Sequence, residues 1–313
     1  MIGAEEDEAM RDATLNESDR PSRLPRPIGL TLVRPSEIYG AEPYFHELTA
    51  GLDRVVRPRG HAVLLRVLPD PEAELDLCRR WSAGGVVDAV VLVDLGVDDP
   101  RVSLVAELEL PAISVSSPAI SSGLPAVWTN DDVAVEEAVD ALALLGHVRL
   151  AHVSGPLRLA HSVARRDTFV AVCDDRGLIA ATVTGDYSFE SGERALSALL
   201  DTQVDSDDQV VEGAPAVPTA VVFDNDLMAL GGLAEARRRG LSVPGDLSIV
   251  AWDDSAQCQL SEPPLSALSH DVQRIGEMVG ETVLAVLDGQ RPPTLEAPAI
   301  VFVPRATTGP PAR

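Results

Sequence analysis

Residues 218–255 contain a complete strand–helix–strand unit, which constrains the fold of this chain more than any other stretch. The run 219–223 is short, apolar and β-branched, as expected of a strand that is buried on both faces. Residues 224–226 read Asp-Asn-Asp, and each of them can cap a helix that begins near Leu227. Apolar side chains then recur at helical spacing until Gly240, which ends the helix. Such a unit is the repeating element of a parallel α/β sheet.

Both strands of this unit end in polar side chains. The second strand is predicted at 247–252 and is closed by Asp253 and Asp254, while Asp224 and Asn225 follow the first. In open parallel sheets, ligands bind at the carboxyl ends of the strands. We therefore expect a small polar ligand to bind where these two clusters lie.

The same alternation runs through most of the chain, which at 313 residues exceeds the usual size of one compact domain. Apolar runs predict further strands at 28–33, 62–67, 86–93, 112–115, 150–154, 180–184 and 300–303. Helical spacing predicts helices at 44–57, 72–81, 102–108, 133–145, 161–176, 190–200 and 272–287, with Asp131 or Asp132 capping the fourth. The pattern predicts the α/β class, with two doubly wound parallel-sheet lobes and right-handed crossovers. The acidic segment 1–26 is expected to be disordered, and the acidic stretch 201–215 to be a surface insertion.

Composition excludes several classes of function. A net charge of −24 repels phosphate backbones, so this chain alone is a poor nucleic-acid binder. All 25 basic residues are arginine, which excludes Schiff-base lysine chemistry and the P-loop lysine. Three widely spaced cysteines, Cys78, Cys173 and Cys258, indicate buried thiols of a reducing compartment. The acidic N-terminus has no apolar signal-peptide core, and no apolar run approaches the roughly 20 residues that span a bilayer. We expect a cytoplasmic protein without a membrane partner.

No pattern in the sequence predicts catalysis. The six histidines show no metal-ligand spacing, and neither a G-x-S-x-G elbow nor a G-x-G-x-x-G loop after a strand occurs. We therefore expect no enzymatic activity, no cofactor and no metal site. His147 in the Leu-Gly-His turn is expected to be structural, and Trp252 to lie in the core or the wall of a cleft.

A series of short motifs carries a resemblance to a known family. In order along the chain these are IGLTLVRP from Ile28, PYF from Pro43, VDAVVL from Val87, LPAISV from Leu110, ALALLGHVRLAHVSGP from Ala141, ARRDTF from Ala164, FDNDLMALGGL from Phe223, VPGDLSIVAWDDS from Val243, EPPLSALSHDV from Glu262 and PRATT from Pro304. Together they resemble the effector-binding core of the LacI/GalR family of bacterial transcription regulators, over roughly residues 27–308. This core shares its fold with periplasmic sugar-binding proteins.

The resemblance implies a ligand cleft between two lobes that close by hinge motion, and it implies a homodimer. It places the N-terminal lobe at 27–129 plus 271–291, the C-terminal lobe at 130–270 plus 292–308, and a tail at 309–313. The implied ligand is a small polar effector, a sugar or a nucleoside. By position in the motifs, the residues that contact it are Arg165, Asn225, Asp253, Tyr44, Phe45, Asn130 and His270. Arginine offers a planar fork of donors, and carboxylate and amide oxygens accept from hydroxyl groups.

The chain also departs from the family pattern. The helix-turn-helix headpiece of about 60 residues is missing, and the acidic residues 1–26 are too few to replace it. Thr168 and Ala251 stand where the family has glycine, and Trp252 stands where it has Phe or Tyr. The favoured interpretation is a regulator whose operator-DNA binding is supplied by a headpiece encoded upstream. The alternative is a headpiece-less cytoplasmic sugar-binding protein without DNA function, and an enzyme on this fold is the third.

Overall fold

The computed structural model of the chain describes residues 24–35, 40, 42–201 and 216–312. Most of the predicted disordered segment 1–26 and nearly all of the predicted insertion 201–215 therefore lie outside the described residues. Among the helices of the described part, none is long and apolar enough to cross a membrane.

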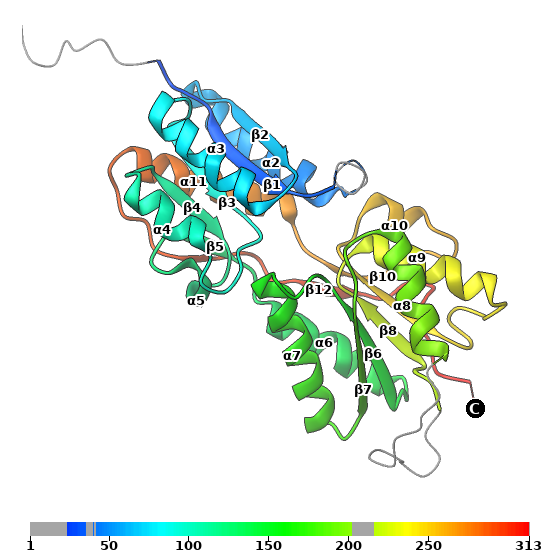
Figure 1. Cartoon of the computed structure of the whole chain (residues 1–313). Coiled ribbons are helices and arrows are strands. Elements are labelled where there is room, and N and C mark those ends of the chain that lie inside the picture. Colours follow the sequence, from blue (N-terminus) through cyan, green and yellow to red (C-terminus); the bar gives the residue numbers. More distant parts are fainter. Residues whose placement is uncertain (1–23, 36–39, 41, 202–215, 313) are drawn as a thin grey trace, which may run out of the picture.

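The described chain forms two α/β lobes, each built on a six-stranded sheet (Figure 1). The N-terminal sheet has the order β11-β5-β4-β3-β1-β2, and the C-terminal sheet has the order β12-β10-β9-β8-β6-β7. Neighbouring strands pair in parallel throughout both sheets, except that β12 runs antiparallel to β10. The predicted fold class is confirmed.

The strands of the N-terminal sheet are β1 (Ile28–Val33), β2 (Val63–Leu68), β3 (Ala89–Leu92), β4 (Ala112–Val115), β5 (Ala126–Trp128) and β11 (Leu295–Glu296). Those of the C-terminal sheet are β6 (Arg149–Ser154), β7 (Ile179–Thr184), β8 (Ala220–Phe223), β9 (Ser248–Trp252), β10 (Ser266–Ser269) and β12 (Val301–Val303). The central strands β3, β8 and β9 are buried along their whole length, because helices cover both faces of the sheet.

Helices of the N-terminal lobe are α2 (Tyr44–Val56), α3 (Pro71–Gly84), α4 (Pro100–Glu107), α5 (Pro118–Ser121) and α11 (Val272–Leu287), with a short 3-10 turn at Arg57–Arg59. Helices of the C-terminal lobe are α6 (Asp131–Leu144), α7 (Ala160–Asp175), α8 (Phe189–Asp201), α9 (Asp226–Arg238) and α10 (Ala256–Leu260). Each lobe has its own apolar core on both faces of its sheet. The three cysteines are free and buried, as the sequence predicts.

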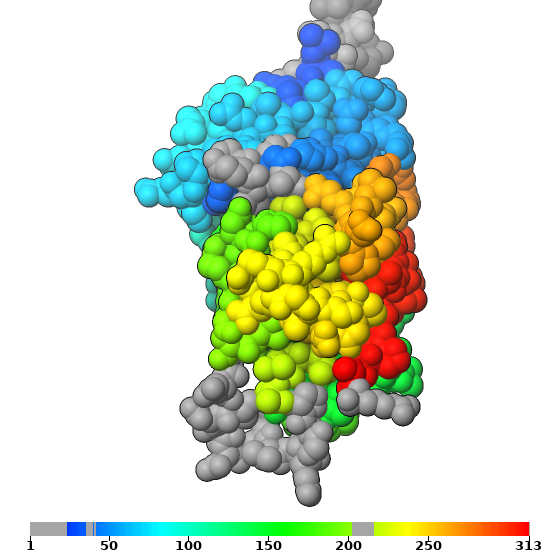
Figure 2. Space-filling view, turned by 90° about the vertical axis from the view of Figure 1, so that its right-hand side faces the viewer, coloured from blue at the N-terminus to red at the C-terminus, as the bar shows by residue number. Residues whose placement is uncertain are grey.

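The chain passes between the lobes three times. The first crossover leads from β5 to α6, the second from β10 to α11, and the third from β11 to β12. Figure 2 shows the two lobes stacked, with the early blue segments in one and the yellow segments in the other. The third crossover corrects a boundary, because 292–308 was expected to belong to the C-terminal lobe. Leu295 and Glu296 pair with Val127 and Trp128 in the N-terminal sheet, so the chain changes lobes only after β11.

The alternation of the sequence predicts most of these elements within a few residues, and three of them, at 28–33, 112–115 and 272–287, coincide with the structure. It misses the short elements α5, α10, β5, β10 and β11. These have only two to five residues each, and elements this short give a weak hydrophobic signal.

Candidate functional site

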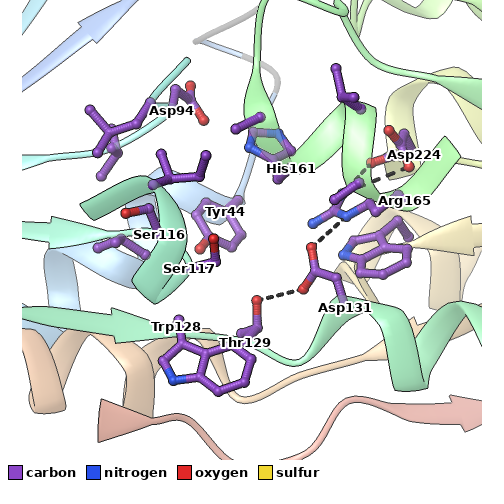
Figure 3. Close-up of a pocket in the computed structure, with 18 of the residues that line it drawn as sticks. Tyr44, Asp94, Ser116, Ser117, Trp128, Thr129, Asp131, His161, Arg165 and Asp224 are labelled. Carbon is purple, nitrogen blue, oxygen red and sulfur yellow. Dashed lines mark hydrogen bonds and ion pairs between the residues drawn. The ribbon is translucent and has the colours of Figure 1, made fainter. Parts of the chain in front are cut away.

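A cavity of about 410 Å³ lies between the lobes, at the level of the crossovers. Its walls come from the carboxyl ends of strands in both sheets and from the first turns of α2, α6 and α7 (Figure 3). All seven side chains that the sequence singled out line it: Tyr44, Phe45, Asn130, Arg165, Asn225, Asp253 and His270. The structure therefore brings together residues that are up to 226 positions apart, from Tyr44 to His270.

Arg165, on the second turn of α7, lies deep in one wall of the cavity. Its Nε donates to Asp131 Oδ2 at 2.7 Å, and its Nη1 lies 3.8 Å from Asp224 Oδ1. The guanidinium group stacks on the ring of Trp252 at 3.7 Å from the ring centroid. These neighbours hold the plane of the guanidinium group at the cavity wall (Figure 3). An N–H group of the guanidinium that these contacts do not use can donate to a hydroxyl group of a ligand.

Asp224 anchors this wall from the end of β8. It is buried, and its two oxygens accept hydrogen bonds from His152 Nε2 at 3.0 Å and from the Gly155 backbone at 2.8 Å. Burial alone raises the pKa of a carboxyl group, but the charge and hydrogen bond of His152, followed by the charge of Arg165, hold the pKa of Asp224 below its usual value. Asp224 therefore remains ionised beneath Arg165.

Asp253 and His270 form a second polar pair on the C-terminal side. His270 Nε2 lies 2.5 Å from Asp253 Oδ1, and the imidazole ring packs against Tyr44 at 5.7 Å between ring centroids. Asp253 has a backbone φ of 72°, an unusual value for a residue other than glycine. Since Tyr44 belongs to the N-terminal lobe, this contact joins the two lobes at the second crossover.

Arg34, just after β1, also lines the cavity, from the N-terminal lobe. It forms ion pairs with Asp94 at 2.6 Å and with Glu42 at 3.3 Å. Its guanidinium carbon lies 5.5 Å from the Phe45 ring and 5.3 Å from the Tyr187 ring. Tyr187 belongs to the C-terminal lobe, so Arg34 is also a contact between the lobes.

Comparisons with known proteins agree with this architecture. A family model described as a periplasmic binding protein-like domain matches residues 139–308. The crystal structure of a LacI family transcriptional regulator from Bifidobacterium animalis subsp. lactis is 33% identical, with a TM-score of 0.80, and the match covers 92% of this chain and 99% of that chain. The chain belongs to the LacI family of transcriptional regulators.

Curated relatives include two LacI-family regulators of known name. The transcriptional regulator MalR of Streptomyces coelicolor is 29% identical over 299 residues, which is 91% of this chain and 81% of MalR. The transcriptional repressor CytR of Escherichia coli is 29% identical over 252 residues, covering 79% of this chain and 69% of CytR.

More distant solved structures share the fold. A complex of the regulator CelR with cellobiose is 23% identical, has a TM-score of 0.78 and covers 91% of this chain and 86% of that chain. A dimeric Lac repressor with an 11-residue C-terminal deletion is also 23% identical, with a TM-score of 0.76, and covers 91% of this chain and 99% of that chain.

Several residues of this LacI-family chain that were expected to contact the ligand cap helices or pack in the core instead. Asn225 caps α9, since its Oδ1 accepts from the Met228 backbone at 2.9 Å and its Nδ2 donates to the Tyr187 carbonyl at 3.0 Å. Asn130, and neither Asp131 nor Asp132, is the cap residue of α6, although it makes no side-chain cap hydrogen bond. Phe45 is 2% exposed and packs in the N-terminal core. Arg165, Asp253, His270 and Tyr44 are therefore the expected residues best placed to meet a ligand.

Sequence reasoning missed other polar residues of the LacI-family cavity. They include Arg34, Glu42, Asp94, Asp131, His161 and Tyr187, whereas Asp224 belongs to the polar cluster that the sequence predicts at the strand ends. One signal was available, because Asp224 and Asp94 each follow a fully buried strand and a carboxylate there needs a partner. His147 is structural as expected, since it contacts Thr219 Oγ1 at 2.8 Å and the Gly309 carbonyl at 3.0 Å. Among the described residues, no group of three or more His, Cys, Asp or Glu side chains is arranged to hold a metal ion.

Asp226, beside the cavity, makes stability depend on pH. Burial, followed by the charge of Asp253, raises the pKa of Asp226 to about 7, and its Oδ2 has no hydrogen-bond partner. Because the folded protein holds this proton more tightly than the unfolded chain, Asp226 lowers stability as the pH rises from about 4 to about 7. Asp226→Asn should match the parent near pH 4 and gain stability relative to it as the pH rises, by roughly 2–3 kcal/mol between pH 5 and pH 8.

Urea unfolding at both pH values measures this difference. Asp174→Asn is the matched control, because Asp174 is exposed near the end of α7. A difference between Asp226→Asn and the parent that stays constant from pH 5 to pH 8 would contradict this account.

Proposed function

We propose that this LacI-family chain is the effector-sensing part of a transcription regulator, with a sugar or a nucleoside as its effector. The observation that carries the proposal is the cavity between the lobes, where Arg165, Asp253, His270 and Tyr44 converge at two of the crossovers. Both curated relatives described above are named as transcriptional regulators, which supports the same role. In this role the protein acts in the cytoplasm and catalyses no reaction.

The chemistry of the cavity suits a polyhydroxylated ligand. Carboxylates accept hydrogen bonds from hydroxyl groups, and the Arg165 guanidinium group donates to them. Aromatic rings of Tyr44 and Trp128 supply flat surfaces for the apolar face of a sugar or a base. The complex of CelR, a protein of similar fold, with cellobiose is consistent with a sugar.

Ligand binding would act by changing the balance between open and closed lobes. In the structure the lobes touch through the Ala160 N–H, which donates to the Leu95 carbonyl at 2.9 Å, and through Arg34 against Tyr187. A ligand that contacts both lobes stabilises the closed arrangement by its differential affinity for it. In a homodimer, as in the Lac repressor structure, such closure would reposition the N-terminal lobes and thereby change operator-DNA affinity.

A thermal-shift panel of hexoses, pentoses, disaccharides including cellobiose, and nucleosides tests the ligand half. A true effector present at about 100 Kd should stabilise the protein by roughly 2.7 kcal/mol. The shift should disappear in Arg165→Ala and in Asp253→Asn, the second being chosen because asparagine tolerates a positive φ. Arg176→Ala, at the far end of α7, should keep it. A shift that survives both cavity variants would refute the site.

The proposed binding of operator DNA has a separate test. The reading frame upstream of Met1 should encode a helix-turn-helix continuous with this chain. A protein that includes this segment should bind operator DNA with an affinity that the effector changes. An effector that binds without any such DNA response would favour a sugar-binding protein without regulatory function.

A further inference from the structure

The cavity is strongly acidic for a site that contains two arginines. Among its described lining residues, the carboxyl groups are Glu42, Asp94, Asp131, Asp132, Asp224 and Asp253, whereas the guanidinium groups are only Arg34 and Arg165. Burial raises the pKa of Glu42 to about 7, but even without Glu42 five carboxyl groups face two guanidinium groups. This excess of negative charge determines which ligand charge the cavity can accept.

Both arginines are already occupied by carboxylates of the protein. Arg34 lies between Asp94 and Glu42, and its guanidinium group also lies near the rings of Phe45 and Tyr187. Arg165 lies between Asp131 and Asp224 (Figure 3), and its guanidinium group stacks on the Trp252 ring. A phosphate that sought a bidentate contact would have to displace a buried carboxylate from its partner, which is unfavourable because that carboxylate would lose its compensating charge.

The histidines of the cavity do not offset the excess of negative charge. Burial, followed by the charge of Arg165, lowers the pKa of His161, so its ring is neutral at physiological pH. His270 is already paired within the protein, because its Nε2 lies 2.5 Å from Asp253 Oδ1.

The partial positive charges of the helix N-termini at the cavity are also largely compensated. Asp131 and Asp132 occupy the first turn of α6, and Asp226 occupies the first turn of α9. The start of α7 carries no acid, but its first N–H donates to the Leu95 carbonyl, and the cavity wall beside it is apolar, with Leu95, Val97 and Ala164.

We propose that the cavity selects its ligand by charge, accepting uncharged or amine-bearing polyols and rejecting phosphate esters and carboxylates. This inference rests on the proposed sensing function and narrows it to sugars or nucleosides that have not been phosphorylated. The carboxylates Asp94 and Asp131 are the specificity determinants, because each faces the cavity while paired to one of its two arginines.

Isothermal titration calorimetry with matched ligands tests this selection at pH 8 and low salt. The probes are glucose, glucosamine and glucose 6-phosphate, cellobiose, and adenosine, cytidine and uridine with their 5′-monophosphates. Each phosphate ester should bind at least about tenfold more weakly than its uncharged parent. Raising the salt concentration to about 0.5 M should narrow that gap, because salt screens the repulsion.

Variants assign the effect to the carboxylates. Asp94→Asn and Asp131→Asn should each reduce the ratio of the ester's Kd to the parent's Kd by roughly threefold or more. Asparagine tolerates the positive φ of Asp94, so the first variant adds no backbone strain. Asp174→Asn is the control, because it removes one exposed charge near the end of α7. It should leave the difference in affinity between each ester and its parent unchanged.

The outcomes separate the two proposals. An ester that binds as tightly as its parent overturns charge selection while leaving the sensing function intact. An affinity difference between ester and parent that neither variant reduces also overturns charge selection, because the cavity would then distinguish the two ligands by shape. Failure of every probe to bind overturns the sugar-or-nucleoside function and charge selection with it.

Discussion

Arg165→Ala is expected to lower the free energy of unfolding at pH 7 by about 3 kcal/mol or more. The substitution leaves Asp131 and Asp224 without the cation between them, and the side chains of these residues are only 12% and 0% exposed. A buried carboxylate that loses its partner keeps the cost of its desolvation and loses the attraction that offset it. The stacking of the guanidinium group on Trp252 is lost as well.

Part of this loss should return at acidic pH. The charge of Arg165 is one of the causes that hold the pKa of Asp224 low, so its removal raises that pKa. A carboxyl group with a depressed pKa stabilises the fold above its unfolded pKa, and the variant has less of this contribution to lose. The difference in stability between variant and parent should therefore shrink as the pH falls from about 4 toward the depressed pKa of Asp224.

Arg176→Ala is the matched control for this experiment. Arg176 also joins α7 to carboxylates of α6, through Glu136 and Asp140, but its surroundings are solvent-exposed. Exposed ion pairs contribute little, so this variant should unfold almost like the parent in urea. Equal losses in the two variants would mean that burial does not govern the contribution of Arg165.

The sequence predicts the architecture well because its hydrophobic pattern is local. Strands β1 and β4 and helix α11 carry enough apolar residues in the right period to be recognised one by one. The last crossover could not be located in this way. Strand β11 has two residues, of which Leu295 is partly buried and Glu296 is exposed, so only its pairing with β5 shows which lobe it joins.

The cavity was predicted less completely, for a different reason. Motif positions identify Arg165 and Asp253, but the partners that orient Arg165 come from three separate elements, with Asp131 on α6, Asp224 after β8 and Trp252 on β9. Whether Asn225 caps a helix or faces a ligand also depends on the backbone around it. A single sequence carries no record of such pairings, since they arise only when the sheets are assembled.

Gly51→Ala should destabilise the protein by about 2 kcal/mol or more, although alanine favours helices. Gly51 lies on α2 where this helix meets α11, and a Cβ atom there would stand 2.0 Å from the Gln273 carbonyl oxygen. On the facing helix, a Cβ atom at Gly276 would stand 2.2 Å from the Leu48 carbonyl oxygen. Backbone atoms cannot rotate away as a side chain can, so the two helices would have to separate.

Gly84→Ala provides the control, since its nearest obstacle is the side chain of the exposed Val86 at 3.3 Å. Urea unfolding of this variant should differ from the parent by no more than about 0.5 kcal/mol. A Gly51→Ala protein as stable as the control would show that α2 and α11 tolerate a wider spacing.

The glycine contact also bears on the cavity. Tyr44 begins α2, and α11 begins two residues after His270, so the spacing of these helices sets the position of the Tyr44 ring against His270. Separation of the helices should therefore weaken effector binding in the Gly51→Ala protein that remains folded, measured by calorimetry well below its unfolding temperature. Unchanged affinity would show that the second crossover, and not the helix pair, holds His270 in place.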